Sequence, residues 1–309
     1  MLGITRRARS WVVLLVGALT IALGVAPAQA AHQPEQIILP GARSAEGIAA
    51  GTGTTFYAGE LFTGNIFRGD VRTGTASTFV TAPAGRMALG LRVDVPHRLL
   101  FVAGGFTGQA YAYDLTTGAT KAVVQLTSED SIINDVAVTS DGAWFTDSLA
   151  AKLYFVPVSA TGLIGQVRTL ALHGPAGVVL PGFNNNGIQA SADGRTLVVA
   201  HTNSEVLNTV DPTTGDSATI AGVSVPNVDG ILLEGRTAYV VQNFSNAVTE
   251  FQLAGDLSSG RLLKTVTNAG FEVPTTVARF GDRLAVVNAK FDTGFPPTAT
   301  QFEVNVVDR

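Results

Sequence analysis

The chain contains six copies of one pattern, in which two short apolar stretches are separated by a tight turn. The pattern is clearest in residues 134–148 and 186–201, where Ser-Asp-Gly and Ala-Asp-Gly turns separate the stretches. The first apolar residue of each copy falls at Ile48, Leu91, Val136, Ile188, Ile231 and Val277. Successive copies are 43, 45, 52, 43 and 46 residues apart. A period of this size indicates a propeller or a solenoid.

Each copy continues with further strand-like segments. After Leu91, for example, come residues 99–104, 110–114 and 121–124. Four strands per copy, with alternating apolar residues, predict an all-β fold: a six-bladed β-propeller of four-stranded antiparallel blades. Lone strand-like segments at 36–39 and 301–307 predict that one end of the chain completes a blade begun at the other, closing the ring. The longest interval contains the Gly- and Pro-rich stretch 174–182, which we expect to be an inserted loop.

The first thirty residues have the pattern of a secretion signal peptide. A basic segment with Arg6, Arg7 and Arg9 precedes the apolar run 11–25, and Ala28-Gln29-Ala30 provides a small-x-small cleavage site. We therefore expect residues 1–30 to be removed and residues 31–309 to form a single propeller domain in a secreted, extracellular protein. The Arg6-Arg7 pair leaves twin-arginine export open as a route. No later stretch is long and apolar enough to predict a membrane span.

Composition excludes several classes of partner and site. Without the signal, 17 basic residues face 24 acidic ones, a balance of −7 that argues against binding to nucleic acid or anionic membranes. Cysteine is absent, which excludes thiolate metal sites, a cysteine nucleophile and disulfides. The four histidines lack the spacing of a zinc or copper site. We expect a monomer that binds a small molecule.

A polar side chain stands two positions ahead of the apolar marker in four of the six copies. The six residues at this position are Glu46, Leu89, Asn134, Asn186, Asp229 and Thr275. An Asn or Asp ahead of a strand is commonly a turn residue, but four oxygen-bearing side chains at one register favour a shared role. Innermost strands line the propeller axis, so Glu46, Asn134, Asn186 and Asp229 are predicted to converge at one mouth. Such an all-oxygen set suits one divalent cation, with Ca²⁺ expected and Zn²⁺, Mn²⁺ or Mg²⁺ as alternatives.

The order Glu-Gly, Asn-Asp, Asn-Gly, Asp-Gly on a six-bladed repeat resembles the gluconolactonase/regucalcin-like (senescence marker protein-like) family of lactone hydrolases. The phrases 134–148 and 186–197 carry most of the match. The resemblance implies metal binding by Glu46, Asn186 and Asp229, with Asn134 contacting the metal-side water or the substrate. It also implies catalysis by Asp229 as general base, together with Asn134, in the hydrolysis of a cyclic ester.

The family's basic residue ahead of the third-blade Asn is missing here, because Ile132 and Ile133 occupy those positions. This departure favours a substrate more apolar than a sugar-acid lactone. The leading hypothesis is thus a secreted divalent-metal-dependent lactonase or esterase acting at the channel mouth. The alternative is a non-catalytic secreted propeller whose cation is structural and whose top face binds a partner. A strictosidine-synthase-like lyase is a third hypothesis that shares the fold but not the four-ligand pattern.

Overall fold

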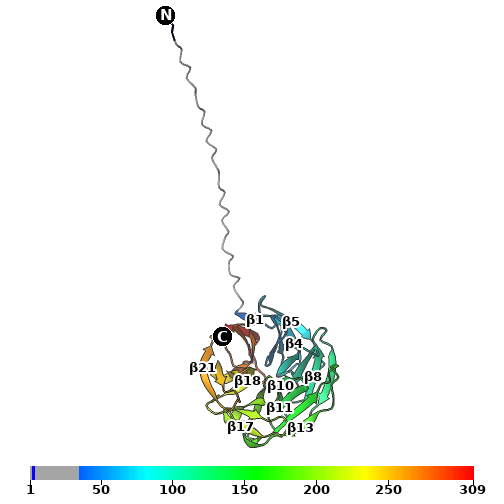
Figure 1. Ribbon diagram of the computed structural model, residues 1–309. Coiled ribbons are helices and arrows are strands. Elements are labelled where there is room, and N and C mark those ends of the chain that lie inside the picture. Colours follow the sequence, from blue (N-terminus) through cyan, green and yellow to red (C-terminus); the bar gives the residue numbers. More distant parts are fainter. Residues whose placement is uncertain (1, 4–34) are drawn as a thin grey trace. The chain divides into compact units, whose positions relative to one another are not determined.

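The computed structural model describes residues 2–3 and 35–309, and residues 35–309 form six four-stranded antiparallel sheets. The sheets follow one another around a common axis in chain order, as the colour sequence in Figure 1 shows. The predicted six-bladed propeller is therefore confirmed. The predicted signal peptide, apart from Leu2 and Gly3, lies outside the described residues. Among the described residues, no helix combines the length and apolar character needed to cross a membrane.

The first three blades have their strands in simple order from the axis outward. Blade one comprises β2 (Ile48–Ala50), β3 (Thr55–Gly59), β4 (Ile66–Asp70) and β5 (Thr75–Val80). Blade two comprises β6 (Leu91–Asp94), β7 (Leu99–Ala103), β8 (Gln109–Asp114) and β9 (Thr120–Gln125). Blade three comprises β10 (Ile133–Thr139), β11 (Gly142–Asp147), β12 (Lys152–Pro157) and β13 (Arg168–Ala171).

Blades four and five repeat this order, and each has a short 3₁₀ helix between its second and third strands. Blade four comprises β14 (Asn185–Ala190), β15 (Leu197–His201), η2 (Thr202–Ser204), β16 (Val206–Val210) and β17 (Ser217–Thr219). Blade five comprises β18 (Val228–Glu234), β19 (Thr237–Gln242), η3 (Asn243–Ser245), β20 (Ala247–Leu253) and β21 (Gly260–Thr267). The predicted insertion is the connection between β13 and β14, which contains η1 (Gly174–Gly177).

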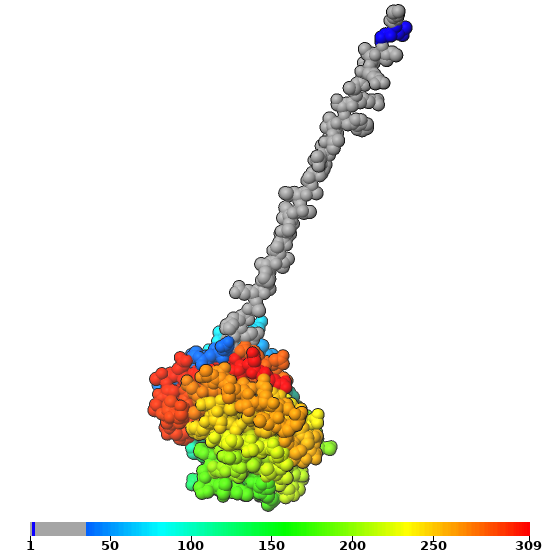
Figure 2. Space-filling model, turned by 90° about the vertical axis from the view of Figure 1, so that its left-hand side faces the viewer, coloured from blue at the N-terminus to red at the C-terminus, as the bar shows by residue number. Residues whose placement is uncertain are grey.

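Blade six closes the ring by combining both ends of the described body. Its strands are β22 (Pro274–Phe280), β23 (Arg283–Asn288), β24 (Glu303–Asp308) and, outermost, β1 (Gln36–Ile38), with η4 (Phe291–Thr293) between β23 and β24. The outermost pair is antiparallel, with Ile37 opposite Val304. In Figure 2 the lighter blue surface of the segment that begins at residue 35 adjoins the red C-terminal surface. The predicted closure is confirmed, and the N-terminal strand provides it.

The hydrophobic core consists of layers between neighbouring blades. Strands alternate their side chains between two faces, so each blade buries apolar residues against the blade on either side. Phe101 of blade two, for example, meets Phe145 of blade three with ring centroids 6.3 Å apart. Ile37 and Phe302 pack in the layer that also holds Phe56 of blade one. Because every sheet face is covered by a neighbour, the ring provides a rigid frame around its axis.

Candidate functional site

All four predicted ligand residues line one pocket of about 450 Å³. They come from four different blades: Asn134 lies on β10, Asn186 on β14, Asp229 on β18, and Glu46 directly ahead of β2. Each of the four is about 5 % exposed. The pocket therefore brings together, near the axis, three side chains from innermost strands and one from the residues just ahead of a fourth.

A β-bulge explains how three of these side chains are directed. The register between the first and second strands shifts between Ile133 and Val136, between Asn185 and Ile188, and between Val228 and Ile231. Asn134, Asn186 and Asp229 lie within these three irregular steps. Because a bulge leaves a residue unpaired and bends the strand, it can redirect a side chain that regular pairing would place on a packed face.

Glycines let neighbouring inner strands approach each other beside the ligand residues. A Cβ atom added to Gly187 would lie 2.6 Å from the backbone oxygen of Asp229, and one on Gly230 would lie 2.7 Å from that of Thr275. At Gly47 an added Cβ would collide with the backbone oxygen of Leu89. The glycines that follow Glu46, Asn186 and Asp229 are thus required by the close approach of the next blade, whereas Asn134 is followed by Asp135.

Hydroxyl groups fix the orientation of the two amides. Ser148 Oγ donates to the backbone oxygen of Asn185 at 2.8 Å, so it accepts from Asn134 Nδ2 at 3.1 Å. Thr202 Oγ1 likewise donates to the backbone oxygen of Val228, at 2.8 Å, and therefore accepts from Asn186 Nδ2 at 3.2 Å. A hydroxyl has a single proton to donate, so each amide must present its Nδ2 group to the hydroxyl. The Oδ1 atoms remain for another partner, and Asn186 Oδ1 is buried without one among the described residues.

The two carboxylates are held differently. Asp229 Oδ2 accepts a hydrogen bond of 3.1 Å from Asn243 Nδ2, and Asn243 Oδ1 accepts from the backbone N–H of Phe244. Glu46 Oε2 is buried and has no hydrogen-bond partner in the part of the chain that the structure describes. The backbone oxygen of Glu46 accepts from Thr275 Oγ1 at 2.6 Å, which ties blade six to blade one at this point.

Burial raises the pKa of both acids. Desolvation, followed by the charges of Asp229 and Asp135, raises the pKa of Glu46 well above its ordinary value. Desolvation also raises the pKa of Asp229 to about 7, against hydrogen bonds from Asn243 and Asn186 that lower it. No Lys, Arg or His is among the residues that line the pocket in the described part of the chain. Nothing in this part of the pocket wall therefore offsets the negative charge that the two carboxylates carry when they are ionised.

The residues fit a divalent cation. Buried polar atoms normally find partners, yet Glu46 Oε2 and Asn186 Oδ1 have none among the described residues. Two carboxylates and two amide oxygens are ligands that hard cations prefer. Across residues 35–309, no cluster of three or more His, Cys, Asp or Glu side chains suits a metal. A cation in this pocket would therefore depend on the amides as well as on the two acids.

The remaining sequence positions have structural roles. Asp135, predicted not to be a ligand, accepts from the backbone N–H groups of Val136 and Ile188, at 2.7 and 3.1 Å. Leu89 contributes an apolar surface to the pocket. His201 is fully buried and bonds Val178 O through Nε2 at 2.9 Å, so it holds the inserted connection rather than reaching the pocket.

Sequence reasoning missed two groups of residues. Ser148, Thr202 and Asn243, which contact the ligand side chains, all follow the second strand of their blade, 14 to 16 positions after the ligand residue. A polar residue at that repeated position was a signal that could have found them. The second group consists of phenylalanines at the pocket wall, namely Phe106, Phe183, Phe244, Phe291 and Phe295. Their spacing from the ligand residues is irregular, so the repeat alone does not reveal them.

The fold and the pocket define a six-bladed β-propeller with an oxygen-rich axial site. No protein-family model matches the chain, and no curated protein matches it in sequence. Solved structures do match. The allergen Mala s 1 of Malassezia sympodialis superimposes with a TM-score of 0.65 at 15 % identity, covering 89 % of this chain and 96 % of that chain.

Two enzymes are also similar in structure. Luciferin-regenerating enzyme gives a TM-score of 0.62 at 13 % identity, with 87 % of this chain and 92 % of that chain covered. A catalytically inactive variant of virginiamycin B lyase from Staphylococcus aureus, solved with quinupristin, gives a TM-score of 0.58 at 12 % identity. The match covers 85 % of this chain and 80 % of that chain. At these identities the likeness establishes the fold alone, and the gluconolactonase/regucalcin-like resemblance stays a prediction.

Proposed function

We propose that this protein is a divalent-metal-dependent hydrolase of lactones or other small esters. The observation that carries the proposal is the set of acceptor oxygens from four blades, two of them without a partner among the described residues, in a pocket whose described wall holds no basic residue. Glu46, Asn134, Asn186 and Asp229 would hold the cation, with Ca²⁺ as the expected ion. When bound there, the cation supplies electrostatic stabilisation for the charge that develops on an ester carbonyl oxygen.

Asp229 is the proposed general base. Asn243 Nδ2 orients the Asp229 carboxylate through Oδ2, and the carboxylate takes the proton of the attacking water. The water oxygen bonds to the carbonyl carbon, the ring C–O bond breaks, and the proton is passed to the leaving alkoxide. The product is a hydroxy acid. Asn134 orients the water or the substrate through its Oδ1, since Ser148 holds its Nδ2.

A lactone panel measured with and without a chelator tests the proposal. Hydrolysis is expected in Ca²⁺, to be lost in EDTA and to return when Ca²⁺ is restored. Asp229→Asn is expected to lower kcat by about 100-fold or more, because it removes the base. Asp141→Asn, which removes an exposed carboxylate in a turn of blade three, is the matched control. Full activity of metal-free protein, or of Asp229→Asn, would overturn the proposal.

A non-catalytic role is the second candidate. Oxygens from four blades meet in the pocket, so a bound ion would also tie the ring together. Mala s 1, which superimposes on this chain, is named as an allergen and not as an enzyme. A rise in melting temperature with Ca²⁺, combined with no hydrolysis across the panel, would favour it. Export of a monomer through the predicted signal peptide is part of both proposals.

A further inference from the structure

Phenylalanines from four blade regions surround the mouth of the pocket. We call Phe106, Phe183, Phe244, Phe291 and Phe295 the phenylalanine collar; all five line the pocket together with the acidic residues. Four of them are unusually exposed for aromatic side chains: Phe106 by 51 %, Phe183 by 43 %, Phe244 by 59 % and Phe295 by 55 %. Clustered exposed apolar side chains at a cavity are typical of a binding surface.

One side of the collar is a continuous aromatic wall. The ring of Phe295 lies 5.6 Å from that of Phe291 and 6.5 Å from that of Phe106, measured between centroids. It also lies 5.2 Å from the ring of Phe62 in blade one. Rings at such separations and inclined to one another pack favourably. The wall therefore spans blades six, one and two beside the pocket.

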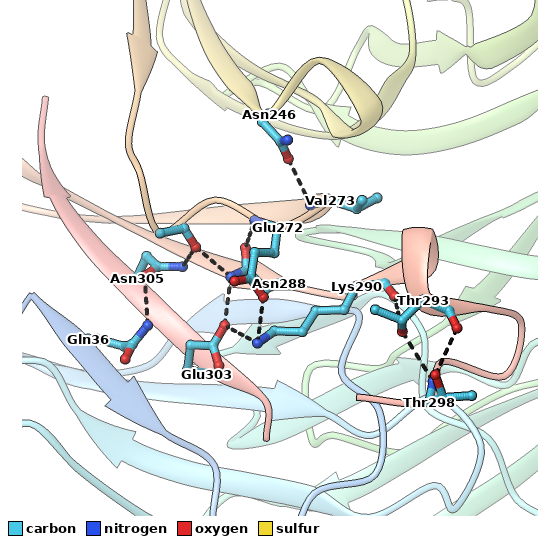
Figure 3. A network of polar contacts seen from close by, with 11 residues as sticks. Gln36, Asn246, Glu272, Val273, Asn288, Lys290, Thr293, Thr298, Glu303 and Asn305 are labelled. Carbon is cyan, nitrogen blue, oxygen red and sulfur yellow. Dashed lines mark hydrogen bonds and ion pairs between the residues drawn. The ribbon is translucent and has the colours of Figure 1, made fainter. Parts of the chain in front are cut away.

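An ion-pair network holds the blade-six part of this wall (Figure 3). Lys290 starts the loop that bears Phe291 and Phe295, and its Nζ contacts Glu303 Oε1 at 3.0 Å and Glu272 Oε2 at 2.7 Å. Further along the loop, Thr298 Oγ1 donates to the backbone oxygen of Thr293 at 2.9 Å. The loop is thus fixed at its start and across its turn, so the wall is present before any ligand arrives.

The opposite side of the collar comes from the insertion between blades three and four. The turn after the second strand carries an apolar collar residue in blades two, five and six, whereas blade four has Asn203 in that region. Asn203 donates to Pro181 O at 2.9 Å and to Phe183 O through its backbone N–H at 3.2 Å. The insertion therefore lies against this turn and brings Phe183 to the pocket where blade four has no apolar residue of its own.

The collar and the pocket floor together select one class of ligand. The floor has two carboxylates, whose charge a bound divalent cation balances, and no basic residue among the described residues that could pair with an anionic substituent of the ligand. Aromatic walls gain free energy by burying apolar surface and offer polyhydroxylated rings few hydrogen bonds. We infer that the ligand is an uncharged ester or lactone bearing an alkyl or aryl substituent, with the ester at the acidic floor and the substituent against the collar. The ester part rests on the proposed function; the apolar part does not.

A homologous series of 5-alkyl γ-lactones up to γ-dodecanolactone, with γ-butyrolactone as the unsubstituted parent, tests the inference, and glucono-δ-lactone is the polar comparison. We expect kcat/KM to rise by about two- to fourfold per methylene, because each methylene that leaves water contributes to binding. Phe106→Ala and Phe295→Ala should flatten this dependence. Leu163→Ala, at a residue that is 72 % exposed and does not line the pocket, is the control and should keep the dependence.

Binding of the uncharged dye N-phenyl-1-naphthylamine, displaced by 5-alkyl γ-lactams, separates this inference from the proposed function. Displacement that strengthens with chain length and fails in the collar variants supports the collar even if no ester is hydrolysed. Hydrolysis without chain-length dependence, or a preference for glucono-δ-lactone, would overturn the collar while leaving the hydrolase. Collar-dependent binding to phosphatidylcholine vesicles with no chain-length effect on lactams would also overturn it, by marking a lipid-facing rim.

Discussion

Thr202 determines which atom of Asn186 faces the pocket. Thr202 Oγ1 donates to the backbone oxygen of Val228 at 2.8 Å and therefore accepts from Asn186 Nδ2 at 3.2 Å. Within the described residues, Asn186 Oδ1 is left buried and unpartnered in a pocket with two acids. The same arrangement at Ser148 and Asn134 shows that the repeat builds it more than once. A residue outside the predicted ligand set thus directs an amide oxygen into the pocket, where the proposed cation would bind.

Replacing Thr202 by Val should weaken cation binding without unfolding the protein. Valine keeps the shape but can neither accept from Asn186 nor donate to Val228, so the amide loses its fixed orientation. We expect about 10- to 100-fold weaker Ca²⁺ binding by calorimetry, the usual effect of losing a residue that orients a ligand. Thr202→Ser retains the hydroxyl and should bind nearly as the wild type does. Equal affinities for the two variants would refute this role of Thr202.

Thr275→Val should destabilise the closure of the ring. Thr275 is fully buried, and its hydroxyl donates to the backbone oxygen of Glu46 across the boundary between blades six and one. Removing the donor leaves a buried carbonyl unpaired, which costs about 1–3 kcal/mol of unfolding free energy. Urea unfolding measures the loss. Thr213→Val, in an exposed turn, should change it by less than about 0.5 kcal/mol; similar losses for the two variants would contradict the account.

The ion-pair network of Figure 3 predicts a larger loss of unfolding free energy for Lys290→Met than for Thr275→Val. Glu303 is 1 % exposed, and removing Lys290 leaves its carboxylate buried with Asn288 Nδ2 as a remaining donor at 2.7 Å. Breaking a buried ion pair from one side costs about 3 kcal/mol. The double variant Lys290→Met/Glu303→Gln removes the charge as well and should recover part of the loss. No recovery in the double variant would show that the buried charge is not the cause.

A matched control exists for Lys290. Lys152 pairs with Glu129 at the surface, where their side chains are 33 % and 68 % exposed. Lys152→Met should therefore change the unfolding free energy by no more than about 1 kcal/mol. A cost equal to that of Lys290→Met would contradict the distinction between the buried and the exposed pair.

Gly187→Ala tests the close approach of the inner strands. The new methyl group would lie 2.6 Å from the backbone oxygen of Asp229 and 2.8 Å from the nitrogen of Ile231, so the backbone of blade five must move. We expect a loss of about 1–3 kcal/mol in stability, together with weaker Ca²⁺ binding because Asp229 is displaced. Gly255→Ala is the control, since no atom of the described residues lies within 4 Å of its added Cβ. Wild-type stability and affinity in Gly187→Ala would contradict the predicted contact.

The fold was predictable because the same hydrophobic pattern recurs in every blade. Six copies of one hydrophobic pattern fix the number of blades, and each strand needs only its own alternation to be recognised. The sequence left open which end supplies the closing strand, because segments 36–39 and 301–307 both have the pattern of a lone strand. The pairing of β1 with β24 decides this through contacts between residues about 270 positions apart.

The candidate site was predictable only as far as it follows the repeat. Glu46, Asn134, Asn186 and Asp229 occupy equivalent positions, so equivalence alone places them together. The collar does not follow the repeat, since Phe183 comes from an insertion and Phe295 from a long loop of blade six. Such residues are brought to the pocket by loop contacts such as those of Asn203 and Lys290. Those contacts join segments with no shared pattern in the sequence.

The metal content of the purified protein tests the central claim most directly. After dialysis against Ca²⁺ and then metal-free buffer, inductively coupled plasma mass spectrometry should find about one divalent ion per wild-type chain. The double variant Glu46→Gln/Asp229→Asn removes both charges of the proposed site and should retain almost none. A wild-type chain that binds no divalent ion, or a variant that retains the wild-type content, would contradict the claim that these residues form a cation site.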